Sequence, residues 1–301
     1  MKTIELVLSK DIISKDYDAS VRDYFSLLKP RVMSLVVFTG FCGMILAPGH
    51  IHPFIAAIAV FCIALGSGAA GAINMWYESD IDALMQRTRN RPIPAGRMCP
   101  ETAIEFACVM AFASVFIMAV AVNLLSAFFL LNAILFYVFI YTIWLKRITP
   151  QNIVIGGAAG AFPPLIGWAA VTNSISIDAV ILFAIIFLWT PPHFWALALY
   201  KSDDYAKAGI PMLPVVKGNE VTRRQILLYS VILVTTTFLP YYTGMSGKIY
   251  LAGVTILDII LLKLVWQINK VYSEQLAKKL FGFSILYLFS IFSLAVIDKV
   301  L

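Results

Sequence analysis

Residues 53–82 of this 301-residue chain read PFIAAIAVFCIALGSGAAGAINMWYESDID, and they indicate its fold. The first 25 of these residues carry no charge. That is longer than the roughly 20 apolar residues with which an α-helix crosses a bilayer. Carboxylates follow at once, at Glu78, Asp80 and Asp82. The stretch therefore predicts a membrane-spanning helix that runs into an acidic segment.

The same apolar character extends along the whole chain. Hydrophobic residues make up 60% of it and charged residues 13%, whereas roughly 25% of residues are charged in soluble domains. This composition excludes a soluble enzyme, a fibrous protein and a disordered chain. Apolar runs bounded by Pro, Gly and charge predict an all-α, polytopic membrane fold with nine spans. The spans are expected near residues 31–48, 53–75, 101–122, 124–144, 151–172, 177–199, 224–245, 249–268 and 280–297.

The basic residues predict how these spans are oriented. Twenty of the 23 Lys and Arg residues fall on the side that holds the N-terminus, and the opposite side carries Lys248 and Lys299. Because cytoplasmic loops are enriched in Lys and Arg, we expect the N-terminus in the cytoplasm and the C-terminus on the outer side. The net charge of +6 is thereby explained by topology, and no nucleic-acid partner is expected.

The ends and the cysteines predict the organisation and the compartment. We expect a cytoplasmic N-terminal segment at 1–29 and one nine-helix domain at 30–301. The first segment contains five acidic residues, which argues against a mitochondrial transit peptide and favours the inner membrane of a bacterium. The four cysteines form no CxxC pair, so neither a disulfide framework nor a zinc site is expected.

Three oxygen-bearing side chains follow the second predicted span in a regular spacing. Asn74, Glu78 and Asp82 are four residues apart, which places them on one face of a helix. Two carboxylates buried together are costly unless a cation lies between them, and Mg²⁺ prefers such oxygen ligands together with substrate phosphates. Four arginines between Arg87 and Arg97 are suited to phosphate. The pattern predicts a site for a metal-bound diphosphate, although simple pairing of acids with arginines is an alternative.

A second polar segment follows the sixth predicted span. It contains Tyr200, Lys201, Asp203 and Asp204, and a ring of helices could bring it to the same cavity as the first segment. Two ions on one diphosphate would stabilise its departure. His193 follows two prolines within the span and is a functional candidate because ionisable residues are costly in a membrane. The alternative is a core histidine bonded to a backbone carbonyl freed by the prolines.

These motifs resemble the UbiA superfamily of intramembrane prenyltransferases, in its heme-modifying branch. The resemblance runs from Lys29-Pro-Arg-Val to the ninth span. Asn74 is followed by Met75, as in the heme-modifying branch, where most of the superfamily has Asp. Tyr200-x-x-Asp203-Asp204 replaces the usual Asp-x-x-x-Asp of the second motif, which leaves the ligands of a second ion open. Its most specific pieces are NMWYESDID at 74–82, MQRTRNRP at 85–92, WLKR at 144–147, WTPPHFW at 189–195 and GIPMLP at 209–214.

The resemblance implies a fold and a reaction. It implies nine helices in a ring around a central cavity whose mouth faces the cytoplasm. It also implies Mg²⁺-dependent transfer of a farnesyl group from farnesyl diphosphate to a vinyl group of heme b, which gives heme O and diphosphate. Heme b is then a substrate rather than a resident cofactor. Expected partners are the lipid bilayer and the next heme-modifying enzyme.

The resemblance also implies roles for individual residues. Asn74, Glu78 and Asp82 would hold one Mg²⁺, and Asp203 and Asp204 a second. The remaining candidates are Lys146 and His193 as catalytic residues and Arg87, Arg91, Tyr200 and Lys201 as substrate-binding residues. His193 could ligate the heme iron or bond a propionate or the diphosphate.

Two other functions compete with this one. The first keeps the superfamily but takes a quinone precursor or chlorophyllide as acceptor; the segment Trp189 to Trp195 and the use of Glu78 in place of Asp argue against it. The second is a transporter, since Pro163-Pro164 and Pro191-Pro192 could break helices near a midplane site. The charges gather at one mouth instead, which disfavours transport.

Overall fold

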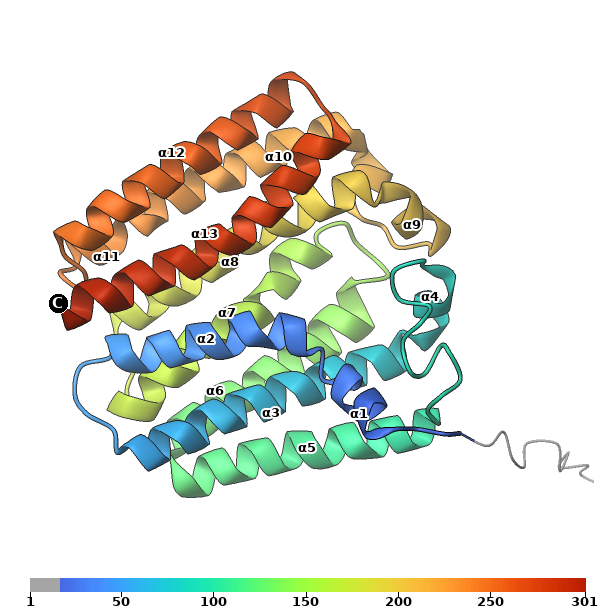
Figure 1. Cartoon of the computed structure of the whole chain (residues 1–301), viewed down its shortest axis with the longest axis horizontal. Coiled ribbons are helices and arrows are strands. Elements are labelled where there is room, and N and C mark those ends of the chain that lie inside the picture. Colours follow the sequence, from blue (N-terminus) through green and yellow to red (C-terminus); the bar gives the residue numbers. More distant parts are fainter. Residues whose placement is uncertain (1–16) are drawn as a thin grey trace, which may run out of the picture.

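The computed structural model describes residues 17–301, and within that range every regular element is a helix (Figure 1). Residues 1–16, which include part of the predicted cytoplasmic segment, lie outside the described residues. The helices are α1 (Val21–Leu27), α2 (Pro30–Leu46), α3 (Pro53–Tyr77), α4 (Ser79–Leu84), α5 (Pro100–Ala121), α6 (Leu124–Leu135), the π-helix η2 (Phe136–Leu145), α7 (Asn152–Thr172), α8 (Ile177–Tyr200), α9 (Ser202–Lys207), α10 (Leu213–Thr237), α11 (Leu239–Tyr242), α12 (Lys248–Lys270) and α13 (Glu274–Val300).

The number of spans agrees with the sequence prediction. Within the described residues, eight helical segments are long and apolar enough to cross a membrane, and α1 with α2 supplies a ninth if this pair, bent by 54°, counts as one span. The first predicted span, 31–48, corresponds to α2. The prediction of an all-α membrane protein is confirmed.

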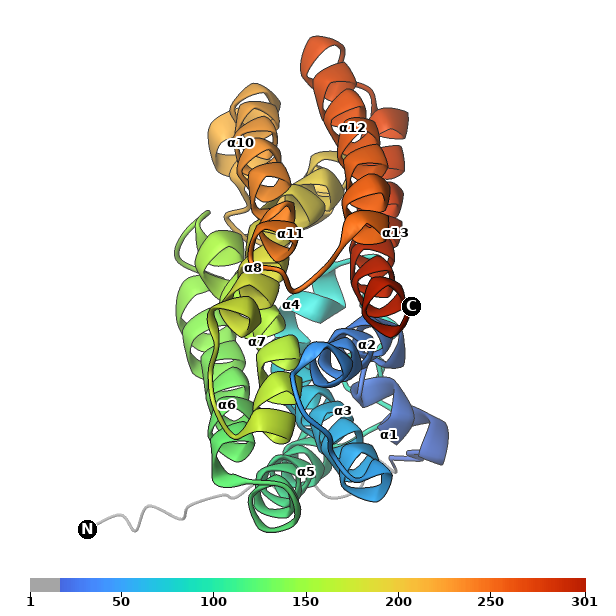
Figure 2. The ribbon, with the colours of Figure 1, turned by 90° about the vertical axis from the view of Figure 1, so that its left-hand side faces the viewer.

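The helices pack in a closed order. Consecutive long helices contact one another, and α13 packs on α2, so that the two ends of the helical domain meet (Figure 2). Inside this order α2 also contacts α7, and α8 contacts α13. The arrangement agrees with the expected ring, whereas the central cavity and the cytoplasmic direction of its mouth stay predictions.

Glycines allow the close contact between α2 and α7. A Cβ atom on Gly43 would collide with the backbone of Pro164, and one on Gly167 would collide with the carbonyl oxygen of Gly40. Small residues let helix backbones approach closely in membranes. The two prolines of α7 therefore lie in a tight helix contact.

Several helices differ from their predicted bounds for physical reasons. The fourth predicted span, 124–144, consists of two elements. It begins as α6 and changes to the π-helix η2 at Phe136. A hydrogen bond from Lys146 N to Tyr141 O of 3.0 Å follows the π-helix. Helix α10 begins eleven residues before the predicted 224. After an apolar first turn, residues 217–224 contain four charged residues and Gly218, whose φ of 80° interrupts the helix. Hydropathy therefore detects only the apolar remainder.

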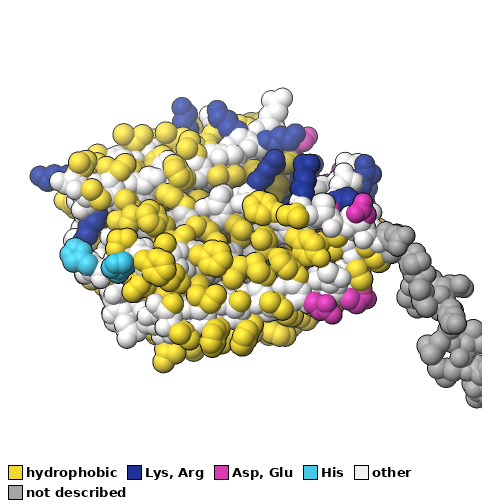
Figure 3. Space-filling model, turned by 60° about the horizontal axis from the view of Figure 1, so that its bottom comes forward, with side chains coloured by type: hydrophobic (Ala, Val, Ile, Leu, Met, Phe, Trp, Pro, Cys, Tyr) yellow, Lys and Arg dark blue, Asp and Glu magenta, His cyan; other side chains and the backbone are white. Residues whose placement is uncertain are grey.

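The charged loops gather at one end of the bundle. In the view of Figure 3, an apolar band lies between one end, which carries most of the visible basic side chains and the acidic ones, and the other end, which carries histidines and a few further basic side chains. Both long polar segments lie there, with α4 and α9 close together in Figure 1. They meet in a hydrophobic cluster in which Ile81 and Met85 pack with Tyr205, Ile210 and Met212. The fold thus places the two predicted polar clusters at one end.

A buried carboxylate joins three helices of the C-terminal half. Asp258 of α12 accepts hydrogen bonds from Tyr287 Oη of α13 at 2.5 Å and from Thr237 Oγ1 of α10 at 3.0 Å. Both partners are neutral hydroxyls, and they come from different helices. The carboxylate of Asp258 therefore links α12 to α10 and α13.

Candidate functional site

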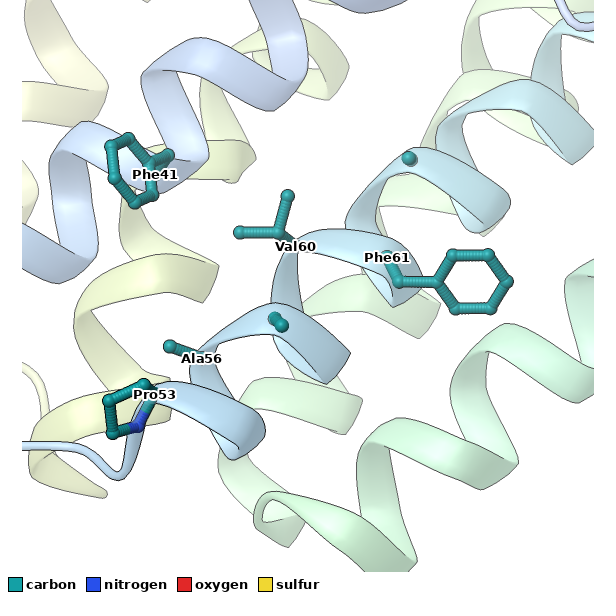
Figure 4. Close-up of a pocket in the computed structure, with 7 residues that line it drawn as sticks. Phe41, Pro53, Ala56, Val60 and Phe61 are labelled. Carbon is teal, nitrogen blue, oxygen red and sulfur yellow. The ribbon is translucent and has the colours of Figure 1, made fainter.

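An apolar groove on the side of the bundle is not the candidate site. It lies between α2 and α3, has a volume of about 610 Å³ and is lined by Phe41, Pro53, Ala56, Val60 and Phe61 together with other apolar residues (Figure 4). None of these side chains can bind a charged group. The polar side chains of interest lie instead at the end of the bundle where α3 meets α4.

The predicted line of oxygen donors persists across a break in the helix. Glu78 ends α3 and precedes α4, with φ −99° and ψ 14°. The backbone still makes bonds from Glu78 N to Asn74 O at 3.0 Å and from Asp82 N to Glu78 O at 2.8 Å. All three side chains are buried, at 2%, 2% and 3% exposure. The two backbone bonds keep the four-residue helical spacing of these side chains across the break.

Each of the three oxygen-bearing side chains, Asn74, Glu78 and Asp82, contacts a different basic side chain. Lys146 Nζ lies 2.5 Å from Glu78 Oε2, and Arg91 Nη1 lies 2.5 Å from Asp82 Oδ2. Lys29 Nζ donates to Asn74 Oδ1 at 2.6 Å. Charge-assisted bonds of this kind hold buried carboxylates that would otherwise be very costly. The pairing of acidic with basic side chains that the sequence left as an alternative thus occurs in the structure. The resulting polar site contains three basic side chains and two carboxylates.

The π-helix supplies two of these contacts. Thr142, which is fully buried in η2, accepts a hydrogen bond from Asn74 Nδ2 at 3.1 Å. Lys146 caps the same π-helix, and its ammonium lies 5.6 Å from the centre of the Tyr141 ring. π-Helical turns are frequent at functional sites because they reorient side chains. Here the turn directs Thr142 and Lys146 toward α3.

One observation indicates that the cluster of Asn74, Glu78 and Asp82 could hold a magnesium ion. Glu78 Oε1 is buried and has no hydrogen-bond partner in the described structure. Leaving a buried carboxylate oxygen unpaired is costly, and a hard divalent cation is the ligand that such an oxygen suits. Within residues 17–301, however, no three His, Cys, Asp or Glu side chains lie close enough to hold an ion by themselves. The cluster offers two carboxylates and an amide, which suits an ion that also binds phosphate.

The second cluster lies close by but does not join the first acids. Asp203 is exposed, and the largely buried Asp204 has its Oδ2 4.0 Å from Lys201 Nζ. Tyr200 is half-buried and lies beneath the Lys278 ammonium, 5.7 Å from the ring centre. Arg87, after α4, is exposed. The fold brings the two loops together, yet it does not assemble the five predicted ion ligands into one group.

His193 is held by a serine rather than by the backbone. It is 8% exposed and stacks between the rings of Trp189 and Phe281, with centroids 4.2 and 4.6 Å away. Its Nδ1 lies 2.7 Å from Ser284 Oγ. The alternative of a bond to a carbonyl freed by the prolines is therefore wrong.

The serine and the tautomer of His193 are coupled. Ser284 Oγ has one proton, which it can donate to Phe281 O or to His193 Nδ1, each at 2.7 Å. When the proton goes to Phe281 O, Nδ1 carries the ring hydrogen and Nε2 keeps its lone pair. An imidazole in this form can accept a hydrogen bond or ligate a metal.

Sequence reasoning missed three members of these clusters. Thr142 and Ser284 lie within apolar helices and carry no local signal. Lys29 does carry one, because it directly precedes Pro30 at the start of the first span. Its contact with Asn74 crosses 45 residues of sequence and becomes visible only in three dimensions.

Solved structures first define the class of protein. A structure of a digeranylgeranylglyceryl phosphate synthase in membranes superposes with a TM-score of 0.78 at 18% identity, covering 93% of this chain and 98% of that one. A UbiA homologue from Archaeoglobus fulgidus, bound to GPP and Mg²⁺, gives a TM-score of 0.62 at 17% identity, covering 91% and 99%. The chain thus has the all-helical fold of the UbiA-type membrane proteins.

The sequence comparisons then establish the family. The UbiA prenyltransferase family matches residues 36–291, and the chain belongs to that family. A relative from Parvibaculum lavamentivorans (strain DS-1) named protoheme IX farnesyltransferase is 57% identical over 286 residues, which covers 94% of this chain and 90% of the relative. The expected resemblance to the heme-modifying branch is confirmed.

Proposed function

We propose that the chain transfers a farnesyl group from farnesyl diphosphate to a vinyl group of heme b, giving heme O and diphosphate. The assignment of heme b as the acceptor is supported by the 57% identity to the Parvibaculum relative over nearly the whole chain. The assignment of a prenyl diphosphate as the donor is supported by the cluster around Glu78 and Asp82, because this cluster combines oxygen ligands for a metal with basic side chains. We place the reaction in a bacterial inner membrane, with the N-terminus cytoplasmic, the C-terminus on the outer side and the site at the cytoplasmic end.

Magnesium is part of this proposal. Asn74, Glu78 and Asp82 would hold one ion, and Asp203 and Asp204 are the candidates for a second. Support comes from the unpaired Glu78 Oε1 and from the Archaeoglobus structure with GPP and Mg²⁺. The metal supplies positive charge to the departing diphosphate.

The basic side chains bind the diphosphate and stabilise its charge. Arg91 and Lys146 lie beside the metal ligands, and Arg87, Tyr200 and Lys201 come from the adjoining turns. As the allylic C–O bond breaks, its electron pair leaves with the diphosphate, whose added charge these preorganised cations stabilise. The terminal carbon of a heme vinyl group attacks the farnesyl cation, and water adds to the resulting heme cation and loses a proton. No protein nucleophile is needed.

Aromatic faces next to Lys146 are suited to the cation. The rings of Tyr137 and Tyr141 lie 5.3 Å apart on η2, and Tyr141 lies beneath the Lys146 ammonium. The face of an aromatic ring attracts positive charge. The farnesyl cation would thus form beside the group that receives the diphosphate.

His193 is proposed as the ligand of the heme iron. Its Nδ1 lies 2.7 Å from Ser284 Oγ, and with the ring hydrogen on Nδ1 its Nε2 would have a free lone pair, which is the arrangement of histidines that bind metals. Ferric heme titrated into the membrane-reconstituted protein should give the absorption spectrum of an imidazole-ligated heme. His193→Ala should remove that spectrum and added imidazole should restore it; an unchanged spectrum in the variant would exclude this role.

The function is tested by product formation. The full chain in lipid vesicles is incubated with heme b, farnesyl diphosphate and Mg²⁺, and heme O is measured by mass spectrometry. A parallel incubation replaces heme b with an aromatic quinone precursor. We expect heme O in the first reaction and no prenylated product in the second. Absence of heme O under conditions in which the Parvibaculum relative forms it, or prenylation of the quinone precursor alone, would overturn the proposal.

A further inference from the structure

The side chain of Arg147 contacts both sides of the helix break at Glu78. Helix α3 ends at Tyr77, and α4 begins two residues later. Arg147 Nη2 donates to the carbonyl oxygen of Tyr77 at 3.4 Å. The two terminal nitrogens of its guanidinium also donate to the two carboxylate oxygens of Asp80, at 2.9 and 3.0 Å. One side chain thus joins the last residue of α3 to the second residue of α4.

The shape of an arginine side chain is required for this set of contacts. A guanidinium is planar and presents its donors as a fork, so it can bond both oxygens of a carboxylate at once. The carbonyl groups at the end of a helix have no partner in their own helix and accept bonds from outside. The guanidinium carbon also lies 5.1 Å from the centre of the Tyr77 ring. Arg147 is therefore attached to α3 by a hydrogen bond and by an aromatic contact.

The turn that carries Arg147 is itself held in place. Ile148 N and Thr149 N both donate to the carbonyl oxygen of Leu145 at 3.1 Å. Asn152 is fully buried, and its Nδ2 donates to the carbonyl oxygen of Thr149 at 2.7 Å. This turn, residues 145–149, is therefore a fixed support for the arginine.

Two consecutive residues of this turn act on the same break. Lys146 pairs with Glu78, which lies in the break, and Arg147 bonds the residues on either side of it. The separation of Asn74 on α3 from Asp82 on α4 depends on the angle between the two helices. Groups that orient metal ligands from outside affect metal affinity strongly. The angle at the break is thus the quantity that Arg147 can control.

General stabilisation does not account for the pair of Arg147 with Asp80. The two side chains are 37% and 63% exposed. Exposed ion pairs contribute little to stability because water and salt screen them. Its place across the break gives the pair a local effect instead.

We propose that Arg147 is a positioning residue for the candidate metal site. With Asp80 as its anchor, it sets the angle between α3 and α4 at which Asn74 and Asp82 face the same ion. Arg147 acts through these residues and does not itself contact the substrate. The inference rests on the proposed function for the identity of the ion and of the reaction.

Amide hydrogen exchange at the break tests this role without any ligand. The full chain in lipid nanodiscs is exchanged in deuterated buffer, and a peptide that covers residues 76–84 is followed by mass spectrometry. In Arg147→Met the backbone bonds across the break should open more often, so that this peptide takes up deuterium several-fold faster. Asp80→Asn should give a smaller increase, because the contact of the arginine with Tyr77 remains.

A matched variant controls for the loss of an exposed arginine. Arg224 is likewise exposed and pairs with Glu220 at 2.6 Å on α10, so Arg224→Met should leave the uptake of the peptide unchanged. The double variant Arg147→Met/Asp80→Asn should not exceed Arg147→Met, since both changes remove one shared contact. Uptake in Arg147→Met equal to that of the wild type would overturn the proposal. If Arg147→Met does not fold, unchanged uptake in Asp80→Asn would overturn it.

The Mg²⁺ dependence of heme O formation separates positioning from charge. Removal of a positive charge near a cation site should by itself favour Mg²⁺ binding, because it reduces Coulomb repulsion. Positioning predicts the opposite. In Arg147→Met the Mg²⁺ concentration that gives half the maximal rate should rise about tenfold, the usual effect of losing a group that orients metal ligands. The KM for heme b should stay unchanged. An equal or lower Mg²⁺ requirement, or a rise confined to the KM for heme b, would contradict the proposal.

The two measurements distinguish this inference from the proposed function. If the wild type forms no heme O and exchange at the break still rises in the variants, the proposed function fails while the role of Arg147 at the break stands. If the wild type forms heme O and exchange at the break is the same in the variants, the proposed function stands and the positioning role fails.

Discussion

Lys146→Met should both destabilise the protein and stop the reaction. Glu78 is 2% exposed, and Lys146 lies 2.5 Å from its Oε2. Because Glu78 Oε1 has no hydrogen-bond partner among residues 17–301, the variant leaves a buried carboxylate without compensation. Breaking a buried ion pair from one side costs about 3–5 kcal/mol. Thermal unfolding in detergent, followed by tryptophan fluorescence, should show this loss.

A second variant separates stability from catalysis. Glu78→Gln combined with Lys146→Met removes both charges and should recover most of the lost stability, since a neutral pair carries no uncompensated charge. It should still form no heme O. Full stability of Lys146→Met alone, or turnover by the double variant, would refute the reasoning about this pair.

Three further results are expected. Gly167→Ala should prevent close packing of α2 on α7, because its Cβ would collide with the carbonyl oxygen of Gly40; a folded yield equal to that of the wild type in membranes would contradict this. Tyr287→Phe removes a 2.5 Å bond to the buried Asp258 and should lower the free energy of unfolding by about 1–3 kcal/mol in detergent melts, with heme O formation retained. Removal of Mg²⁺ by a chelator should stop heme O formation and readdition should restore it, and a rate that is independent of the ion would refute the metal's role.

The spans and the first cluster could be predicted from local sequence. Uncharged runs long enough to cross a bilayer mark the helices, and four-residue spacing places Asn74, Glu78 and Asp82 on one face. Both signals follow from helix geometry alone. They survive even though the helix breaks at Glu78.

The partners of that cluster could not be predicted, because they are set by tertiary packing. Lys146 pairs with Glu78 across 68 residues and His193 with Ser284 across 91 residues. The π-helix that directs the Thr142 side chain toward Asn74 cannot be recognised from the hydropathy of the sequence. The polar segment near the start of α10 was likewise missed, since a helix that leaves the bilayer loses its apolar signal.

The central claim is that the buried side chains of Asn74, Glu78 and Asp82, at the end of α3, hold the reacting diphosphate and its metal. Glu78→Gln and Asp82→Asn each remove one negative charge and preserve side-chain shape. The most direct measurement is heme O formation by each variant in vesicles, with membrane insertion and folded content checked in parallel. The account predicts correctly inserted proteins that form no heme O. Turnover near the wild-type rate in either variant would contradict it.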